Sequence, residues 1–152
     1  MTSSHKVRAL VRLYDQRRER TLAEIARIER KREQSREAGQ QLDAQIDSVQ
    51  ALLNEQLARR GVMDRAALYE ARRHMAVLLS RRLDLRQSRI EAEREVERLQ
   101  TACDAERGRL LGVEKKRGNY QEWLQGQRRA RLAHRALLEQ SEIEERTSWC
   151  KR

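Results

Sequence analysis

Residues 59–64, with the sequence RRGVMD, separate two long stretches of chain that share a seven-residue pattern of apolar side chains. Gly61 suits the left-handed backbone position that follows a helix end, and Asp64 suits the N-cap of the next helix. No comparable break occurs elsewhere, because the sequence has no Pro and its six Gly residues are single and scattered. The sequence therefore predicts two helices joined at this point.

The stretch before the break carries a heptad seam that starts at Val7. Its positions, spaced alternately by four and three residues, are Val7, Val11, Tyr14, Arg18, Thr21, Ile25, Ile28, Arg32, Ser35, Gly39, Leu42, Ile46, Val49, Leu53, Gln56 and Arg60. Most are apolar or Tyr, as the seam of a coiled coil requires. Arg32, Ser35 and Gly39 interrupt the seam, and a Gly in mid-helix costs about 1 kcal/mol relative to Ala. The first helix is expected to be weakest there, with room for a bend.

The stretch after the break carries a longer and cleaner seam. Its positions are Leu68, Ala71, Met75, Leu78, Arg82, Leu85, Arg89, Ala92, Val96, Leu99, Cys103, Glu106, Leu110, Val113, Arg117, Tyr120, Leu124, Gln127, Arg131, His134 and Leu138. Cys103 and His134 are seam residues, and packing is favoured for both over metal binding or catalysis.

Two amphipathic helices joined by a short loop dock most economically against each other in antiparallel orientation. We therefore expect an all-α fold in which two long helices form an antiparallel coiled-coil hairpin, a single elongated domain over residues 1–152. The expected bounds are about 5–59 for the first helix, 60–64 for the turn and 65–146 for the second helix, followed by a frayed tail.

In such a hairpin, residues whose numbers add up to roughly 124 lie opposite each other, which would place Val7 near Arg117. The last thirty or so residues would then extend beyond the first helix. This segment contains Tyr120, Trp123, a basic run and an acidic run: Arg128, Arg129, Arg131 and Arg135, then Glu139, Glu142, Glu144 and Glu145. Negative charge at a helix C-terminus opposes the helix dipole, so these acids predict either fraying or a partner that binds them.

Composition excludes several classes of function. The three His and two Cys residues show no metal or nucleophile spacing, and the single Glu70 and His74 pair lacks further ligands. No glycine-rich phosphate loop is present, so no cofactor, metal, catalytic residue or small-molecule substrate is expected. The sequence has no long apolar span and no secretory signal at its start, which favours the cytoplasm.

The formal net charge of +10 raises the alternative of a nucleic-acid-binding coiled coil. The 34 basic residues are, however, interleaved with 24 acidic ones, and only Arg128–Arg135 forms a block. Such a block favours an acidic protein surface over DNA, so nucleic acid is the less favoured partner. A plain dimeric scaffold is the other alternative.

The whole pattern resembles the FliJ/YscO (SctO) family of type III secretion stalk proteins. Three segments carry the resemblance: VRALVRLYDQRRER near the start, GVMDRAALYEARRHMAVLLSRR in the middle, and KKRGNYQEWLQGQRRAR followed by EQSEIEE near the end. The resemblance implies a non-enzymatic stalk at the base of an inner-membrane secretion apparatus. It would bind the pore of the hexameric secretion ATPase, promote assembly and activity of that ring, and link it to the export gate.

The same resemblance implies regional contacts and further partners. Secretion chaperones are bound by some members of the family. The ATPase-facing residues would be Val7, Val11, Tyr14, Tyr120, Trp123, Arg128, Arg129, Arg131 and Arg135. The residues facing the cytoplasmic ring of the export gate would be Leu53, Leu57, Leu68, Tyr69, Met75 and Leu78.

Overall fold

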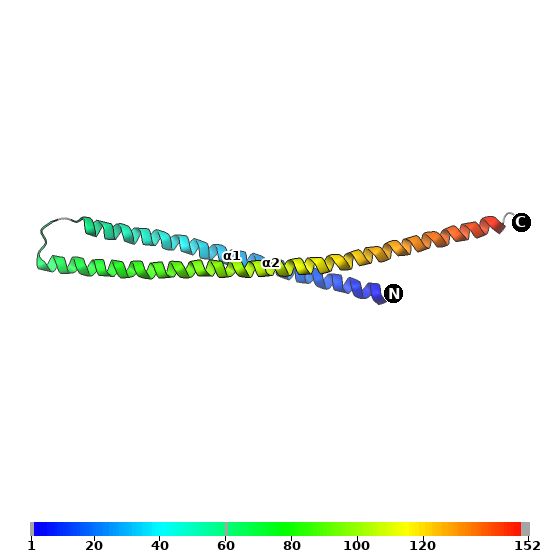
Figure 1. Cartoon of the computed structure of the whole chain (residues 1–152), viewed down its shortest axis with the longest axis horizontal. Helices are drawn as coiled ribbons and strands as arrows, with labels where there is room; N and C mark the ends of the chain where they lie inside the picture. The colour runs from blue at the N-terminus through cyan, green and yellow to red at the C-terminus, as the bar shows by residue number, and fades with distance from the viewer. Residues whose placement is uncertain (1, 60, 150–152) are drawn as a thin grey trace. The chain divides into compact units, whose positions relative to one another are not determined.

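The computed structural model describes residues 2–59 and 61–149 of the chain. Two helices, α1 (Thr2–Ala58) and α2 (Arg65–Trp149), make up nearly all of this part, and it contains no strand (Figure 1). The helices run antiparallel, so the expected all-α helical hairpin is confirmed. α2 continues to Trp149, where a frayed tail was expected after residue 146.

Contacts divide the chain into two units, and each contains a segment of both helices. One unit consists of Glu24–Ala105 and includes the loop between the helices. The other consists of Met1–Ala23 and Glu106–Arg152. We refer to them as the turn unit and the terminal unit.

The buried apolar side chains all lie on the two predicted seams. They are Ile25, Ile28, Leu53, Leu78, Leu85, Leu99 and Cys103. Cys103 is completely buried, which confirms packing as its role. The remaining described seam positions from Val7 to Gln56 and from Ala71 to Leu124 are half-buried, apart from the buried Gly39. The heptad spacing therefore correctly predicts which face of each helix is packed.

The pairing register differs from the expected one. In the side-chain pairs Asp43–Arg89 and Gln50–Arg82 of the turn unit, and in Arg18–Glu114 of the terminal unit, the two residue numbers add up to 132. The expected value of about 124 assumed helix ends that are level with each other. Residues 59–64 instead join ends that are offset, so Val7 is level with the region of residue 125, and Arg117 pairs with Asp15.

The loop shows one confirmed and one wrong prediction. Asp64 caps α2, because its Oδ1 accepts a hydrogen bond from the backbone N of Ala67 at 2.7 Å. Gly61 was expected to adopt a left-handed conformation, but no described residue has a positive φ. The reason is that α1 already ends at Ala58, so Gly61 does not occupy the position directly after the helix.

The polar interruption of the first seam is bridged by contacts between the helices. Arg32 donates a hydrogen bond to Gln100, and Arg89 donates to both carboxylate oxygens of Asp43 at 2.9 Å. The guanidinium of Arg89 covers Gly39, at 3.6 Å from where a Cβ would stand. α1 runs through this region as one continuous helix, in which Arg32 and Gly39 contact α2 although Nε of Arg32 is buried without a hydrogen-bond partner.

Candidate functional site

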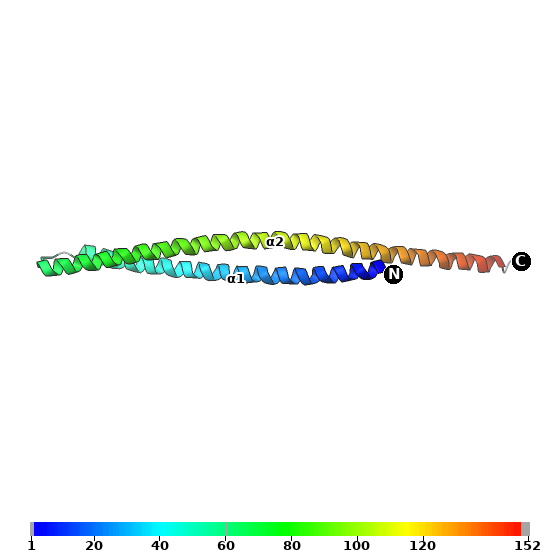
Figure 2. The same cartoon turned by 90° about the horizontal axis from the view of Figure 1, so that it is seen from below.

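The C-terminal part of α2 in the terminal unit has no helix opposite it. From Gln125 to Arg146, every residue is exposed. The register explains most of this exposure, because Thr2 at the start of α1 is level with about residue 130 of α2, so that no described residue of α1 lies opposite residues 131–146. Both views show α2 continuing past the N-terminus of α1 (Figures 1 and 2). We call Gln125–Arg146 the overhang.

The residues expected to face an ATPase fall into two groups. Val7, Val11 and Tyr14 are half-buried on α1, and the Tyr14 and Tyr120 rings pack at 5.6 Å between centroids. Trp123 is exposed, as are the four basic residues of the overhang, Arg128, Arg129, Arg131 and Arg135. Only this second group consists of exposed residues.

Two details of the expected overhang need correction. Tyr120 belongs to the paired part of the hairpin, because it packs on Tyr14. His134 was assigned to packing in the seam, but it is exposed. The seam pattern continues beyond the end of α1, so heptad position alone could not reveal that its partner helix had ended.

A basic groove lies in the paired part of the terminal unit, with a volume of about 410 Å³. Arg17 and Arg20 of α1 and Arg109 and Lys116 of α2 line it, and Arg17 lies 5.4 Å from the centroid of the Tyr14 ring. This groove was not predicted from the sequence, since the cations on its two helices are about ninety positions apart in the chain. The correct pairing register would have found it. Its charge suits an acidic partner.

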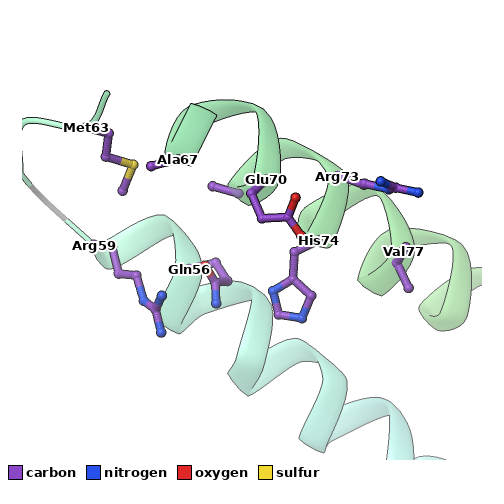
Figure 3. A pocket seen from close by; sticks show the side chains of 9 residues that line it. Gln56, Arg59, Met63, Ala67, Glu70, Arg73, His74 and Val77 are labelled. Atoms are coloured by element: carbon purple, nitrogen blue, oxygen red, sulfur yellow. The ribbon is translucent and has the colours of Figure 1, made fainter. Parts of the chain in front are cut away.

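The turn unit has a second open surface where the two helices separate. Because α1 ends at Ala58, the first turns of α2 lack a partner, and a cavity of about 600 Å³ opens there. Figure 3 shows the side chains that line it, with Met63 and Ala67 at the loop and Gln56 and His74 farther along the helices. Arg59 and Arg73 also line this cavity.

The residues expected to face an export gate are split by this geometry. Leu53 and Leu78 are buried, at 2% and 8% exposure, and Met75 is half-buried. Leu57, Leu68 and Tyr69 are exposed around the loop, together with Val62 and Met63. We call these five exposed residues the turn patch. The buried residues hold the helices together, whereas the turn patch consists of apolar side chains exposed to solvent.

Two ion pairs on the exposed faces of the turn unit shift pKa values. A hydrogen bond from Arg27 lowers the pKa of Glu24, and one from Arg98 lowers the pKa of Glu95. Both pairs join residues three apart on one helix. They stabilise the helices locally and belong to neither open surface.

In the part of the chain that the structure describes, neither open surface has the grouping of side chains that a metal site needs. Within residues 2–59 and 61–149, no three His, Cys, Asp or Glu side chains are grouped to hold a metal ion. Glu70 and His74 both line the turn cavity without a third ligand of that kind (Figure 3). Among the described residues, neither helix has a stretch long and apolar enough to cross a membrane.

Comparison with known proteins identifies the family of this chain. No curated protein and no solved structure matches the chain. The family model described as Salmonella surface presentation of antigen gene type M protein matches residues 5–147. Because the match spans both helices and the loop, the chain belongs to this family, whose members are components of the type III secretion apparatus.

Proposed function

We propose that this protein is the stalk of a type III secretion apparatus, of the FliJ/YscO type, and that its terminal unit binds in the pore of the hexameric secretion ATPase. Family membership supports a place in the apparatus. The single observation that carries the stalk role is the overhang, a helical segment with all of its residues exposed, most of which lies beyond the start of α1. Such a segment requires a partner to cover its apolar side chains.

The charges of the terminal unit indicate what kind of partner this is. The basic groove and the four Arg residues of the overhang present positive charge from both the paired and the unpaired part of one unit. A pore lined with acidic side chains would attract this unit and guide it into place. The stalk acts on the ATPase by holding the subunits around one axis, which promotes assembly of the ring and raises its activity.

The turn patch is the proposed contact for the cytoplasmic ring of the export gate. Its five residues are exposed apolar side chains beside an open cavity, which is the arrangement of a protein-binding surface. The protein would thus connect ATPase and gate in the cytoplasm, at the base of the inner-membrane apparatus. It would do so by binding alone, with no chemistry of its own.

The first test measures the steady-state rate of the cognate secretion ATPase with and without the protein. A chain truncated after Leu124 removes the overhang but keeps the Tyr14–Tyr120 packing. The proposal expects stimulation by the full chain and none by the truncated one. The double variant Arg128→Glu/Arg129→Glu should stimulate less, whereas Arg86→Glu/Arg94→Glu, with two exposed Arg residues of the turn unit changed, should stimulate normally.

The same samples test the nucleic-acid alternative. Steep loss of DNA or RNA binding with rising salt, in a protein that neither binds nor stimulates the ATPase, would refute the stalk role. For the gate contact, Tyr69→Ala should weaken binding to the cytoplasmic ring of the gate, because large exposed aromatic residues often dominate such interfaces. Leu83→Ala, at an exposed position of α2 outside the turn patch, is the matched control.

A further inference from the structure

The overhang contains a charge pattern in which basic residues come first and acidic residues follow. The heptad seam that packs α2 against α1 continues into the overhang at Arg131 and Leu138, and one heptad later at Glu145. Leu138 is thus flanked on the same helical face, seven residues away on either side, by a cation and an anion. Beside this line, Arg135 and Glu142 repeat the same order. The charged residues thus lie at nearly equal distances before and after Leu138, with basic residues on one side and acidic residues on the other.

A pattern of this kind is complementary to itself in antiparallel orientation. When two overhangs cross at Leu138, Arg131 of each chain lies opposite Glu145 of the other, and Arg135 opposite Glu142. A parallel pair would instead place like charges opposite each other. The two contacts are related by a twofold axis, so the interface closes with two chains.

The apolar side chains of the overhang suit this arrangement. Leu137 and Leu138 are 65% and 50% exposed, and they stand at the centre of the proposed crossing. His134 is also exposed, and in this crossing it lies near Ser141 of the other chain. Acidic residues near the C-terminus of a helix are unfavourable for the helix dipole, and cations from a second chain offset that cost.

From these features we propose that two copies of the protein associate through their overhangs as an antiparallel pair centred on Leu138. The pairing covers the overhang that the stalk role presents to the ATPase. The free protein would therefore be held as a dimer that cannot enter the ring, and the ATPase would compete with the second copy. This regulatory consequence depends on the proposed stalk function, whereas the dimer itself does not.

Charge reversal tests the pairing by sedimentation equilibrium without any ATPase. The variants Arg131→Glu/Arg135→Glu and Glu142→Arg/Glu145→Arg should each self-associate at least about tenfold more weakly, since four opposite-charge pairs become like-charge pairs. A mixture of the two should form a heterodimer, and one chain carrying all four substitutions should form a homodimer again. The double variant Arg86→Glu/Arg94→Glu should behave as the unaltered protein. A monomeric unaltered protein, or a mixture that stays monomeric, would overturn the proposal.

Disulfide trapping tests the orientation in chains that also carry Cys150→Ser; Cys103 is fully buried and stays unreactive. His134→Cys chains mixed with Ser141→Cys chains should give a mixed disulfide. Leu132→Cys, on the opposite face of the helix, should give none with Ser141→Cys. If the His134→Cys chains instead formed mainly disulfide-linked homodimers, the two overhangs would be parallel, and the proposed antiparallel pairing would be refuted. A trapped dimer that still stimulates the ATPase would refute the regulatory consequence alone.

Discussion

Replacing Arg82 with Leu is expected to stabilise the hairpin, although it removes a contact between the helices. Arg82 lies on the α2 seam between the buried Leu78 and Leu85, and its Nη1 donates a hydrogen bond to Oε1 of Gln50 at 2.6 Å. Its Nε, however, is buried without a hydrogen-bond partner. A buried donor that lacks a partner costs about 1–3 kcal/mol, whereas an ordinary hydrogen bond contributes about 1 kcal/mol.

The expected net effect follows from these two terms. Gln50 remains half-buried and keeps its own hydrogen bond to Asn54, so water can replace the lost donor. The Leu side chain retains the apolar contact that the Arg stem makes. The free energy of unfolding should therefore rise by about 1 kcal/mol, which raises the melting temperature by about 2–4 °C for a chain of this size.

Urea unfolding followed by circular dichroism measures this change. Arg82→Met, which keeps the length of the stem without the guanidinium, should stabilise similarly. Arg86→Leu, at an exposed position, should leave the unfolding free energy nearly unchanged. All samples must be compared at one protein concentration, because self-association would add to apparent stability. Destabilisation of Arg82→Leu and Arg82→Met by about 1 kcal/mol or more would show that the unpartnered Nε carries no cost, and would refute the reasoning.

Four further changes test other parts of the fold. Leu53→Ala should destabilise the hairpin by about 2–5 kcal/mol in urea unfolding because Leu53 is buried, whereas Leu52→Ala, at an exposed neighbour, should cost far less. Asp64→Ala should lower the free energy of unfolding by about 1 kcal/mol because it removes the cap of α2, whereas Asp64→Asn, whose side chain can still cap the helix, should lower it much less. Equal losses of stability in the two variants would contradict the capping role. Gly39→Ala should stabilise α1 by about 0.5–1 kcal/mol, as the new methyl group meets the Arg89 guanidinium at ordinary contact distance; a lower melting temperature would show that this contact is too tight. Acidification below pH 4.5 should lower the stability of the hairpin, because ion pairing with Arg lowers the pKa of Glu24 and of Glu95 in the folded state. The double variant Glu24→Gln/Glu95→Gln should lose less stability over the same pH range, as measured by thermal unfolding.

Heptad spacing was sufficient to predict the packed faces of both helices, because a side chain's position on a helix depends only on its place in the sequence. Ile25, Leu53, Leu85 and Cys103 are buried as that spacing requires. The cap at Asp64 was equally predictable, since it depends on residues three apart.

The pairing register was not predictable from the same information. It depends on how residues 59–64 cross from one helix to the other, and a six-residue loop can join ends that are level or offset. The offset decided which surfaces are open: it exposed the turn patch, placed Tyr120 against Tyr14 and created the basic groove. The candidate sites thus depend on a long-range geometry that local patterns do not encode.

The single pairing register shared by the contacts of both units also constrains how the length of this chain can change. One residue inserted into α1 would turn the seam beyond it by about 100° and move it off the face that α2 covers. An insertion of seven residues into α1 would keep the seam on the face that α2 covers, but the side chains would still pair only if α2 also gained seven residues at the facing position. Residues added after Ala130 or in the loop between the helices face no such requirement, because no described residue of a facing helix is opposite them. Related chains should therefore differ by matched heptads within the paired helices and by single residues only in the loop and the overhang.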